Sequence, residues 1–264
     1  MTNNKEDITD FGFQKVKISE KGNLVKNVFN SVASKYDLMN DLMSGGMHRI
    51  WKRQMIKEID FKNSVPSSLT SDYQYNILDV AGGTGDIAFA IIKKALKAAF
   101  NIKAEIADIN PQMLKFGQNR AIDNNMFSFL TFTEADGENL PYNDNNFDYY
   151  TIAFGIRNFT NIEKGLKEAY RILKPNGKFI CLEFSEINNL ILSKIYDLYS
   201  FNIIPKIGKF ITNDQNSYQY LVESIRKFPN QEKFRKMIEA VGFKNVSYQN
   251  LNFGLVAIHT AIKL

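Results

Sequence analysis

The chain has 264 residues, 44% of them hydrophobic and 23% charged, a balance typical of a globular protein that can bury one large α/β sheet. The formal net charge is +5, but lysines alternate with acids and form no dense basic run, so we expect a solvated surface and no nucleic-acid partner. A single cysteine, Cys181, excludes an internal disulfide and indicates a reducing compartment, and with only two histidines a His/Cys metal site is excluded as well.

The N-terminal region is expected to be helical. Its first residues carry acids and lack the apolar run of a signal peptide, and no stretch of 18 residues in the chain is free of charge. In YDLMNDLMSGGMHRIW, residues 36–51, methionines recur every four residues, although Gly45 and Gly46 interrupt the repeat. The charge distribution predicts a cytoplasmic protein with no membrane-spanning segment. The methionine spacing predicts that residues 36–51 form a partly buried helix face.

Strands alternate with helices through the middle of the chain. Five strands are predicted, at residues 75–81, 103–109, 127–136, 147–156 and 178–185. Asn110 and Pro111 have the residue types of an N-cap and a first helical position, and Pro175 and Gly177 are expected to end a later helix. Two further strands near the C-terminus are close enough to form a hairpin. The order predicts a doubly wound, seven-stranded, mostly parallel sheet with one antiparallel strand, the Rossmann-like α/β fold of class I methyltransferases.

The glycine loop ILDVAGGTGD follows the first strand of the sheet and opens a helix, where doubly wound folds bind ligands. The dinucleotide fingerprint G-x-G-x-x-G fails here, because in register with Gly83 its first position is Ala81 and its last is Asp86. An acid at the start of a helix would also repel a pyrophosphate. The loop instead follows acid-x-G-x-G-x-G, beginning at Asp79 with Ala81 in the first glycine position.

That pattern suits a sulfonium cofactor with an amino-acid moiety. An acid or a carbonyl can bind the ammonium group, and backbone N–H groups or the hydroxyl of Thr84 can bind the carboxylate. Gly83 and Gly85 allow the backbone to approach closely.

Two more acids follow successive strands. Asp108 ends the second strand, where a carboxylate can accept both hydroxyl hydrogens of an adenosine ribose. Asp136 follows the third strand, where it can accept from the adenine amino group while the backbone N–H of Gly137 serves a ring nitrogen. A single acid at a strand end is often only exposed or a helix cap. Three in order favour S-adenosylmethionine as the cofactor.

The chain resembles the ubiquinone/menaquinone biosynthesis C-methyltransferases from about Phe11 to its C-terminus. The resemblance rests on YDLMNDLMSGGMHRIW, LDVAGGTGD, ADIN, FGIRNF, RILKPNGKFICLEFS and SYQYLVESI. It implies methylation of a ring carbon of a polyprenyl quinol, either 2-polyprenyl-6-methoxy-1,4-benzoquinol, demethylmenaquinol or both. It also implies two parts, a helical substrate cover at residues 1–62 and a cofactor-binding methyltransferase domain at residues 75–264.

By this resemblance, the cofactor positions fall on Thr84, Asp108, Asp136 and Gly137. Relatives often have asparagine and alanine in place of Asp136 and Gly137, and serine in place of Ala153. Because Ala153 has no hydroxyl, we expect it to contribute only a cavity wall or a backbone contact.

Four residues are candidates for catalysis. Arg157 is expected to hold the quinol oxygen or to orient a water, as an electrostatic aid and not as a base; a structural ion pair is the alternative. Asn158 either positions the substrate or caps the next helix. His48 and Tyr36 are candidate proton carriers, although His48 could be structural. His259, in a terminal strand, is expected to serve packing.

The substrate's apolar tail implies that this cytoplasmic protein makes peripheral contact with the inner face of the membrane. The apolar segment at residues 188–211 is the candidate for this contact, with burial on the sheet or at a homodimer interface as the alternatives. Other enzymes of quinone biosynthesis are the expected partners. Two other functions compete, a nicotinamide-dependent oxidoreductase, disfavoured by the broken fingerprint, and a non-catalytic scaffold that retains the cofactor site.

Overall fold

A seven-stranded sheet forms the centre of the protein in a computed structural model that describes residues 8–32, 40–41, 44–61, 73–187, 190–202, 205–206 and 215–264. Its strands follow the order β5-β4-β3-β6-β7-β9-β8. They are β3 (Gln74–Val80), β4 (Asn101–Asp108), β5 (Leu130–Glu134), β6 (Phe147–Ala153), β7 (Leu173–Phe184), β8 (Lys244–Leu251) and β9 (Val256–Ile262). β9 runs antiparallel to both of its neighbours, and the other pairs are parallel. The predicted sheet, with its single antiparallel strand, is confirmed.

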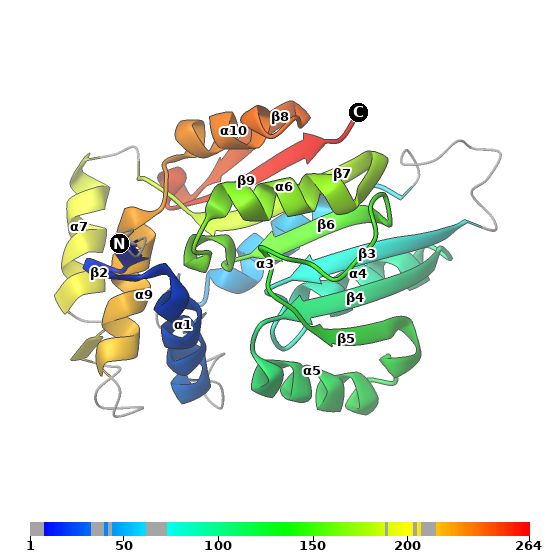
Figure 1. The fold of residues 1–264 in the computed structure, drawn as a ribbon, viewed down its shortest axis with the longest axis horizontal. Helices are drawn as coiled ribbons and strands as arrows, with labels where there is room; N and C mark the ends of the chain where they lie inside the picture. Colours follow the sequence, from blue (N-terminus) through cyan, green and yellow to red (C-terminus); the bar gives the residue numbers. More distant parts are fainter. Residues whose placement is uncertain are drawn as a thin grey trace, which may run out of the picture.

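Helices cover both faces of the sheet (Figure 1). One hydrophobic core contains buried residues of α3 (His48–Lys57), α4 (Asp86–Lys97) and α5 (Pro111–Asp123), and the other contains those of α6 (Ile162–Ile172) and α10 (Gln231–Ala240). Successive side chains of a strand point to opposite faces, so Ile77 of β3 belongs to the first core and Leu78 to the second. This confirms a doubly wound fold.

Local signals place some element boundaries and miss others. The Asn110 side chain caps α5 by accepting hydrogen bonds from two backbone N–H groups, with Pro111 at the first helical position, as predicted. The helix was predicted to end at Pro175 and Gly177, but α6 already ends at Ile172 and β7 begins at Leu173. Leu173 pairs with Phe147 of β6, so the chain enters the sheet before the proline.

The N-terminal region begins with strands where the sequence predicted helix. β1 (Ile8–Phe11) and β2 (Gln14–Lys17) form an antiparallel hairpin ahead of α1 (Ile18–Val32). Gly12 supplies the positive φ of +60° that the tight turn requires. The hairpin is fastened to α9 (Gln215–Lys227) by a 2.9 Å hydrogen bond from the Phe13 N–H to the Glu223 carboxylate. In Figure 1 these elements lie near α7 (Leu190–Asn202) and α9, at the left end of the sheet.

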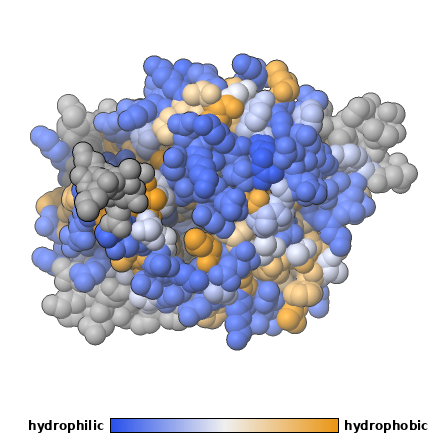
Figure 2. All heavy atoms as spheres, viewed as in Figure 1, coloured by the Kyte–Doolittle hydropathy of each residue, from blue (hydrophilic) through white to orange (hydrophobic). Residues whose placement is uncertain are grey.

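The outer surface is largely polar on the face that Figure 2 shows, where apolar residues form only small separate groups. Within the described residues, no helix is long and apolar enough to cross a membrane. The described part of the chain also contains the short 3₁₀ segments η3 (Phe127–Phe129), η4 (Ile156–Asn158) and η5 (Asn252–Gly254).

Candidate functional site

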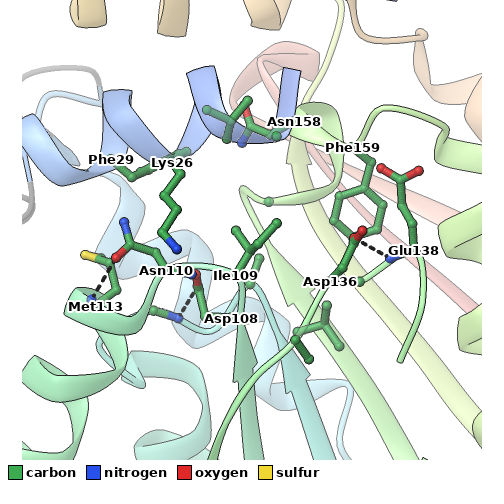
Figure 3. A pocket seen from close by; sticks show the side chains of 18 of the residues that line it. Lys26, Phe29, Asp108, Ile109, Asn110, Met113, Asp136, Glu138, Asn158 and Phe159 are labelled. Carbon is green, nitrogen blue, oxygen red and sulfur yellow. Dashed lines mark hydrogen bonds between the residues drawn. The ribbon is translucent and has the colours of Figure 1, made fainter. Parts of the chain in front are cut away.

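A cavity lies where β3, β4, β5 and β6 end, and α1 forms its opposite wall. Its open volume, including the mouth, is about 840 Å³. The loops after the four strands contribute Gly83, Asp108, Asp136 and Gly155, and α1 contributes Phe29. The carboxyl ends of parallel strands are where doubly wound folds bind ligands. Figure 3 shows Asp108 and Ile109 in this cavity, with Asn158 above them and Asp136 to the side.

Asp108 connects the glycine loop to the cavity. One of its carboxylate oxygens accepts a hydrogen bond from the Gly83 N–H at 2.9 Å, and the other accepts from the Asn110 N–H at 2.8 Å. Gly83 has a φ of +53°, which a residue with a side chain rarely adopts. Burial raises the pKa of the Asp108 carboxyl to about 6, although its two backbone hydrogen bonds favour the ionised form. This carboxylate lines the cavity beside a backbone fixed in position, as an acceptor for hydroxyl groups requires.

Asp136 and Gly137 lie across the cavity from α1. Asp136 accepts a 2.9 Å hydrogen bond from the Glu138 N–H and is exposed at the mouth. The Glu138 carboxylate in turn accepts from the N–H groups of Thr160 and Asn161. These bonds hold the loop after β5 against the loop after β6.

Gly137 leaves room for an aromatic ring. A Cβ atom added at Gly137 would lie 2.4 Å from Cζ of Phe159, whose ring lines the cavity. A Cβ atom added at Gly165 would also lie 2.4 Å from that ring. The ring therefore occupies the space between the two glycines, which gives a physical reason for glycine at a position where relatives often have alanine.

Replacing Gly137 with alanine is expected to lower the free energy of unfolding by about 1–3 kcal/mol, because the added methyl group overpacks against the Phe159 ring. Combining it with Phe159→Val should recover most of that loss, since the smaller side chain vacates the space. Urea unfolding of the two single variants and the double variant measures this coupling. If the losses in the double variant were additive, the Phe159 ring would not be the reason why position 137 requires glycine.

α1 covers the cavity from the N-terminal side. Lys26 lines the cavity and its ammonium group lies 3.3 Å from the Glu134 carboxylate. The Asn30 side-chain oxygen accepts a 2.8 Å hydrogen bond from the Asn110 amide. The buried Lys21 donates a 2.7 Å hydrogen bond to the carbonyl of Phe159. Three contacts thus join this helix to the loops after β4, β5 and β6.

Four of the predicted cofactor residues do not line this cavity. Asp79 is buried beneath the glycine loop, where it accepts from the Thr151 hydroxyl at 2.8 Å and from the Ala88 N–H at 3.3 Å. Burial raises its pKa to about 7. The other three are Thr84, Gly85 and Ala153.

Each of these three has another structural role. The Thr84 hydroxyl accepts a 2.8 Å hydrogen bond from Arg120, which also pairs with Asp86. Gly85 has a φ of +86° and precedes the first residue of α4. Ala153 is partly buried and packs against the first hydrophobic core. Asp79 and these residues shape the loop from behind, whereas Gly83, Asp108, Asp136 and Gly137 line the cavity.

Arg157 forms a buried ion pair next to the cavity. Its guanidinium lies 2.8 Å from the Glu183 carboxylate, and the two side chains are 4% and 1% exposed. It also donates to the Phe154 carbonyl and, at 3.3 Å, to the Ser224 hydroxyl. This geometry favours the structural ion pair that the sequence left open, and Arg157 does not line the cavity.

The residue after Arg157 does line it. Asn158 lies in the wall of the cavity, and its side-chain oxygen accepts a 3.0 Å hydrogen bond from the Tyr220 hydroxyl. It does not cap α6, because Asn161 performs that role.

His48 lies in a separate hollow on the outer side of α4. Its Nδ1 is 3.0 Å from the Ser44 hydroxyl, and the hollow is also lined by Lys52, Asp86 and Arg120. Burial, followed by the nearby Lys52 charge, lowers the pKa of His48, so its imidazole is neutral at pH 7.

The fourth catalytic candidate, Tyr36, lies outside the described part of the chain. His259 is buried, and its Nε2 lies 3.0 Å from the Gln231 carbonyl, the packing environment expected for it. Within the described residues, no cluster of side chains could hold a metal ion.

Several cavity residues were missed from the sequence. Asn110 was predicted only as a helix cap, but it also lines the cavity and binds α1. Its place two residues after Asp108, at a strand end, was the available signal. For Lys26, Phe29 and Phe159, the spacing of residues along the chain gave no signal of a place in the cavity. Only the folded chain brings α1 and the loop after β6 to the ends of the strands.

Comparison with solved structures supports the fold. A methyltransferase from Thermotoga maritima, described as S-adenosylmethionine-dependent and as a possible histamine N-methyltransferase, has a TM-score of 0.60 at 18% identity, over 91% of this chain and 100% of that one. The carbon methyltransferase DszA has a TM-score of 0.58 at 15% identity, over 90% and 65% of the two chains. At these identities the similarity is one of fold.

Sequence comparison is more specific. A Rickettsia bellii protein named ubiquinone/menaquinone biosynthesis C-methyltransferase UbiE is 55% identical over 97% of this chain and 99% of its own length. The protein of that name from Rickettsia prowazekii is 52% identical over the same shares. Residues 15–263 match a single family of methyltransferases. Because that match includes α1, the whole sheet and every loop around the cavity, the chain belongs to the ubiE/COQ5 methyltransferase family.

Proposed function

We propose that this protein is an S-adenosylmethionine-dependent C-methyltransferase that methylates a ring carbon of a polyprenyl quinol in ubiquinone or menaquinone biosynthesis. The observation that carries the proposal is the Asp108 carboxylate, which lines a cavity at the end of β4 in a chain of this family. The substrate is a 2-polyprenyl-6-methoxy-1,4-benzoquinol, a demethylmenaquinol or both.

The chemistry and the charge of the groups that line the cavity support this cofactor. Asp108 offers two acceptor oxygens for the ribose hydroxyls, and Asp136 with the Gly137 N–H offers an acceptor and a donor for the adenine edge. Among the described residues, the charged groups that line the cavity are the carboxylates of Asp108, Asp136 and Glu138 and the ammonium group of Lys26. This excess of negative charge favours a ligand with a positive sulfonium centre.

The reaction needs little from the protein beyond orientation and charge stabilisation. The cofactor supplies a methyl group on positive sulfur. When bound, it would transfer this methyl group to a ring carbon of the quinol, which would lose one proton in exchange. The quinol becomes a better nucleophile as its hydroxyl proton leaves, so a donor to the resulting oxyanion accelerates the reaction. Asn158 lies in the cavity wall, which supports its assignment as this donor.

The apolar tail of the substrate requires access from a membrane. We propose that α7 makes peripheral contact with the inner face of the membrane, since Leu198 of this helix is 64% exposed. Lys194 on the same helix is exposed as well, which suits anionic headgroups. Contact with other quinone-biosynthesis enzymes and a homodimer belong to the same proposal.

Two measurements test the function. Calorimetry with S-adenosylhomocysteine should give saturable binding, whereas NADH should not bind; the reverse result would favour the oxidoreductase. In a host that lacks its own C-methyltransferase, expression of this chain should restore methylated quinones, measured by mass spectrometry. The Asp108→Asn variant is the matched control and should not restore them. Cofactor binding without any methylated quinone would favour the non-catalytic scaffold.

A further inference from the structure

The hydroxyl of Tyr220 contacts a residue of the cavity wall from behind. Tyr220, on α9, is 4% exposed and donates a 3.0 Å hydrogen bond to the side-chain oxygen of Asn158. The ring of Phe11 from β1 stacks on the Tyr220 ring with a centroid distance of 4.0 Å. Two elements far apart in the sequence therefore hold one phenol against one amide.

This contact determines which end of the amide is available to a ligand. A side-chain amide has one acceptor oxygen and one nitrogen with two donors. Burial raises the pKa of Tyr220, so its hydroxyl stays protonated and can donate. With the Asn158 oxygen bonded to Tyr220, its nitrogen keeps both of its donors for a ligand, because it donates no hydrogen bond to any of the described residues.

The neighbouring arginine is not available in the same way. The Arg157 guanidinium is bonded to Glu183, to the Phe154 carbonyl and to Ser224, and it lies outside the cavity lining. Asn158 is thus the residue of this segment that presents a side-chain donor to the cavity. Because the Asn158 amide is neutral, it adds no positive charge to the cavity, whereas a guanidinium would.

We propose that Tyr220 is a positioning residue that fixes the Asn158 amide with its N–H groups toward the substrate, where they donate to the quinol oxygen that becomes negative during methyl transfer. This inference rests on the proposed function. Tyr220 touches neither substrate nor cofactor in it, and acts only through Asn158.

Turnover of the Tyr220→Phe variant tests the inference. The assay follows tritium transfer from S-adenosyl-[methyl-³H]methionine to a reduced demethylmenaquinone, and to a benzoquinol, each with a short prenyl tail. We expect kcat to fall by about tenfold or more, with the Kd for S-adenosylhomocysteine within about twofold of wild type. Tyr218→Phe, the same change two residues earlier on α9, is the control and should leave both values unchanged.

The Asn158 variants test the direction of the amide. Asn158→Ala should lower kcat by about a hundredfold, and adding Tyr220→Phe should then have no further effect, since the tyrosine acts through the amide. Asn158→Asp keeps the acceptor for Tyr220 but has no donor, so it should lose at least as much as Asn158→Ala. This variant also keeps the test decisive if Tyr220→Phe folds poorly.

Three outcomes would overturn the inference. They are wild-type turnover in Tyr220→Phe, multiplying losses in the double variant, and retained turnover in Asn158→Asp, which would indicate an acceptor instead of a donor. A separate result would contradict the proposed function itself. If the wild-type protein bound S-adenosylhomocysteine but methylated neither quinol, the proposed function would fail, and this inference with it.

Discussion

Replacing Asp108 with asparagine is expected to weaken S-adenosylhomocysteine binding by about a hundredfold or more. Two hydrogen bonds from hydroxyls to a carboxylate contribute about 1.5–3 kcal/mol each, and a loss of about 3 kcal/mol corresponds to roughly a hundredfold in Kd. Asparagine retains one acceptor oxygen, but its NH₂ group must face either the Gly83 N–H, the Asn110 N–H or the ligand, all of which are donors on that side. Calorimetry of the purified variant measures the loss.

A matched control lies on the adjacent strand. Glu134 pairs with Asp108 in the β4–β5 register, its side chain is 55% exposed, and it does not line the cavity. Glu134→Gln should therefore change the Kd by no more than about twofold. Equal losses in the two variants would mean that the cavity responds to general charge and that Asp108 has no specific role.

The same carboxylate predicts how binding depends on pH. Burial raises the pKa of Asp108 to about 6 in the free protein, and hydroxyl donors of a ligand favour the ionised form. Affinity should therefore be constant at high pH and fall by about tenfold per pH unit as the pH drops below about 6. Asp108→Asn should abolish this decline, and a decline of the same steepness in that variant would assign it to another group.

The sequence predicted those features that depend on residues close together in the chain. Alternating strand and helix patterns, with an antiparallel pair at the end, were sufficient for the sheet. A glycine loop followed by acids at successive strand ends was sufficient to predict that Asp108 and Asp136 lie together, and both line the cavity, because the carboxyl ends of parallel strands meet at one edge.

The features that the sequence leaves open depend on where a side chain points. Thr84 and Gly83 are adjacent, yet one bonds to Arg120 behind the loop and the other lines the cavity. Likewise, Arg157 is paired with Glu183 beside a second hollow, whereas Asn158 lines the cavity. Sequence spacing places both members of each pair at the strand ends and does not distinguish them. The N-terminal hairpin was missed because a four-residue strand has too short a pattern to outweigh a helical reading.

Variants of the Arg157–Glu183 ion pair can distinguish a role of Arg157 in stability from a role in catalysis. Replacing Arg157 with methionine leaves the Glu183 carboxylate, only 1% exposed, without its cation, and breaking such a buried pair costs about 3–5 kcal/mol. Urea unfolding should show a loss of this size. The double variant with Glu183→Gln should recover most of it, because the glutamine has no charge and its oxygen can still accept from the Phe184 backbone N–H.

The double variant also decides what the arginine does during turnover. The Arg157 guanidinium is bonded within the protein and lies outside the cavity lining, so once stability is recovered we expect kcat to remain within about tenfold of wild type. Loss of about a hundredfold or more in a stable double variant, with unchanged S-adenosylhomocysteine affinity, would instead assign Arg157 the electrostatic role that its sequence position first indicated. Since Asn158 follows it directly, that result would require the segment to turn when the quinol binds, and bring the guanidinium into the cavity.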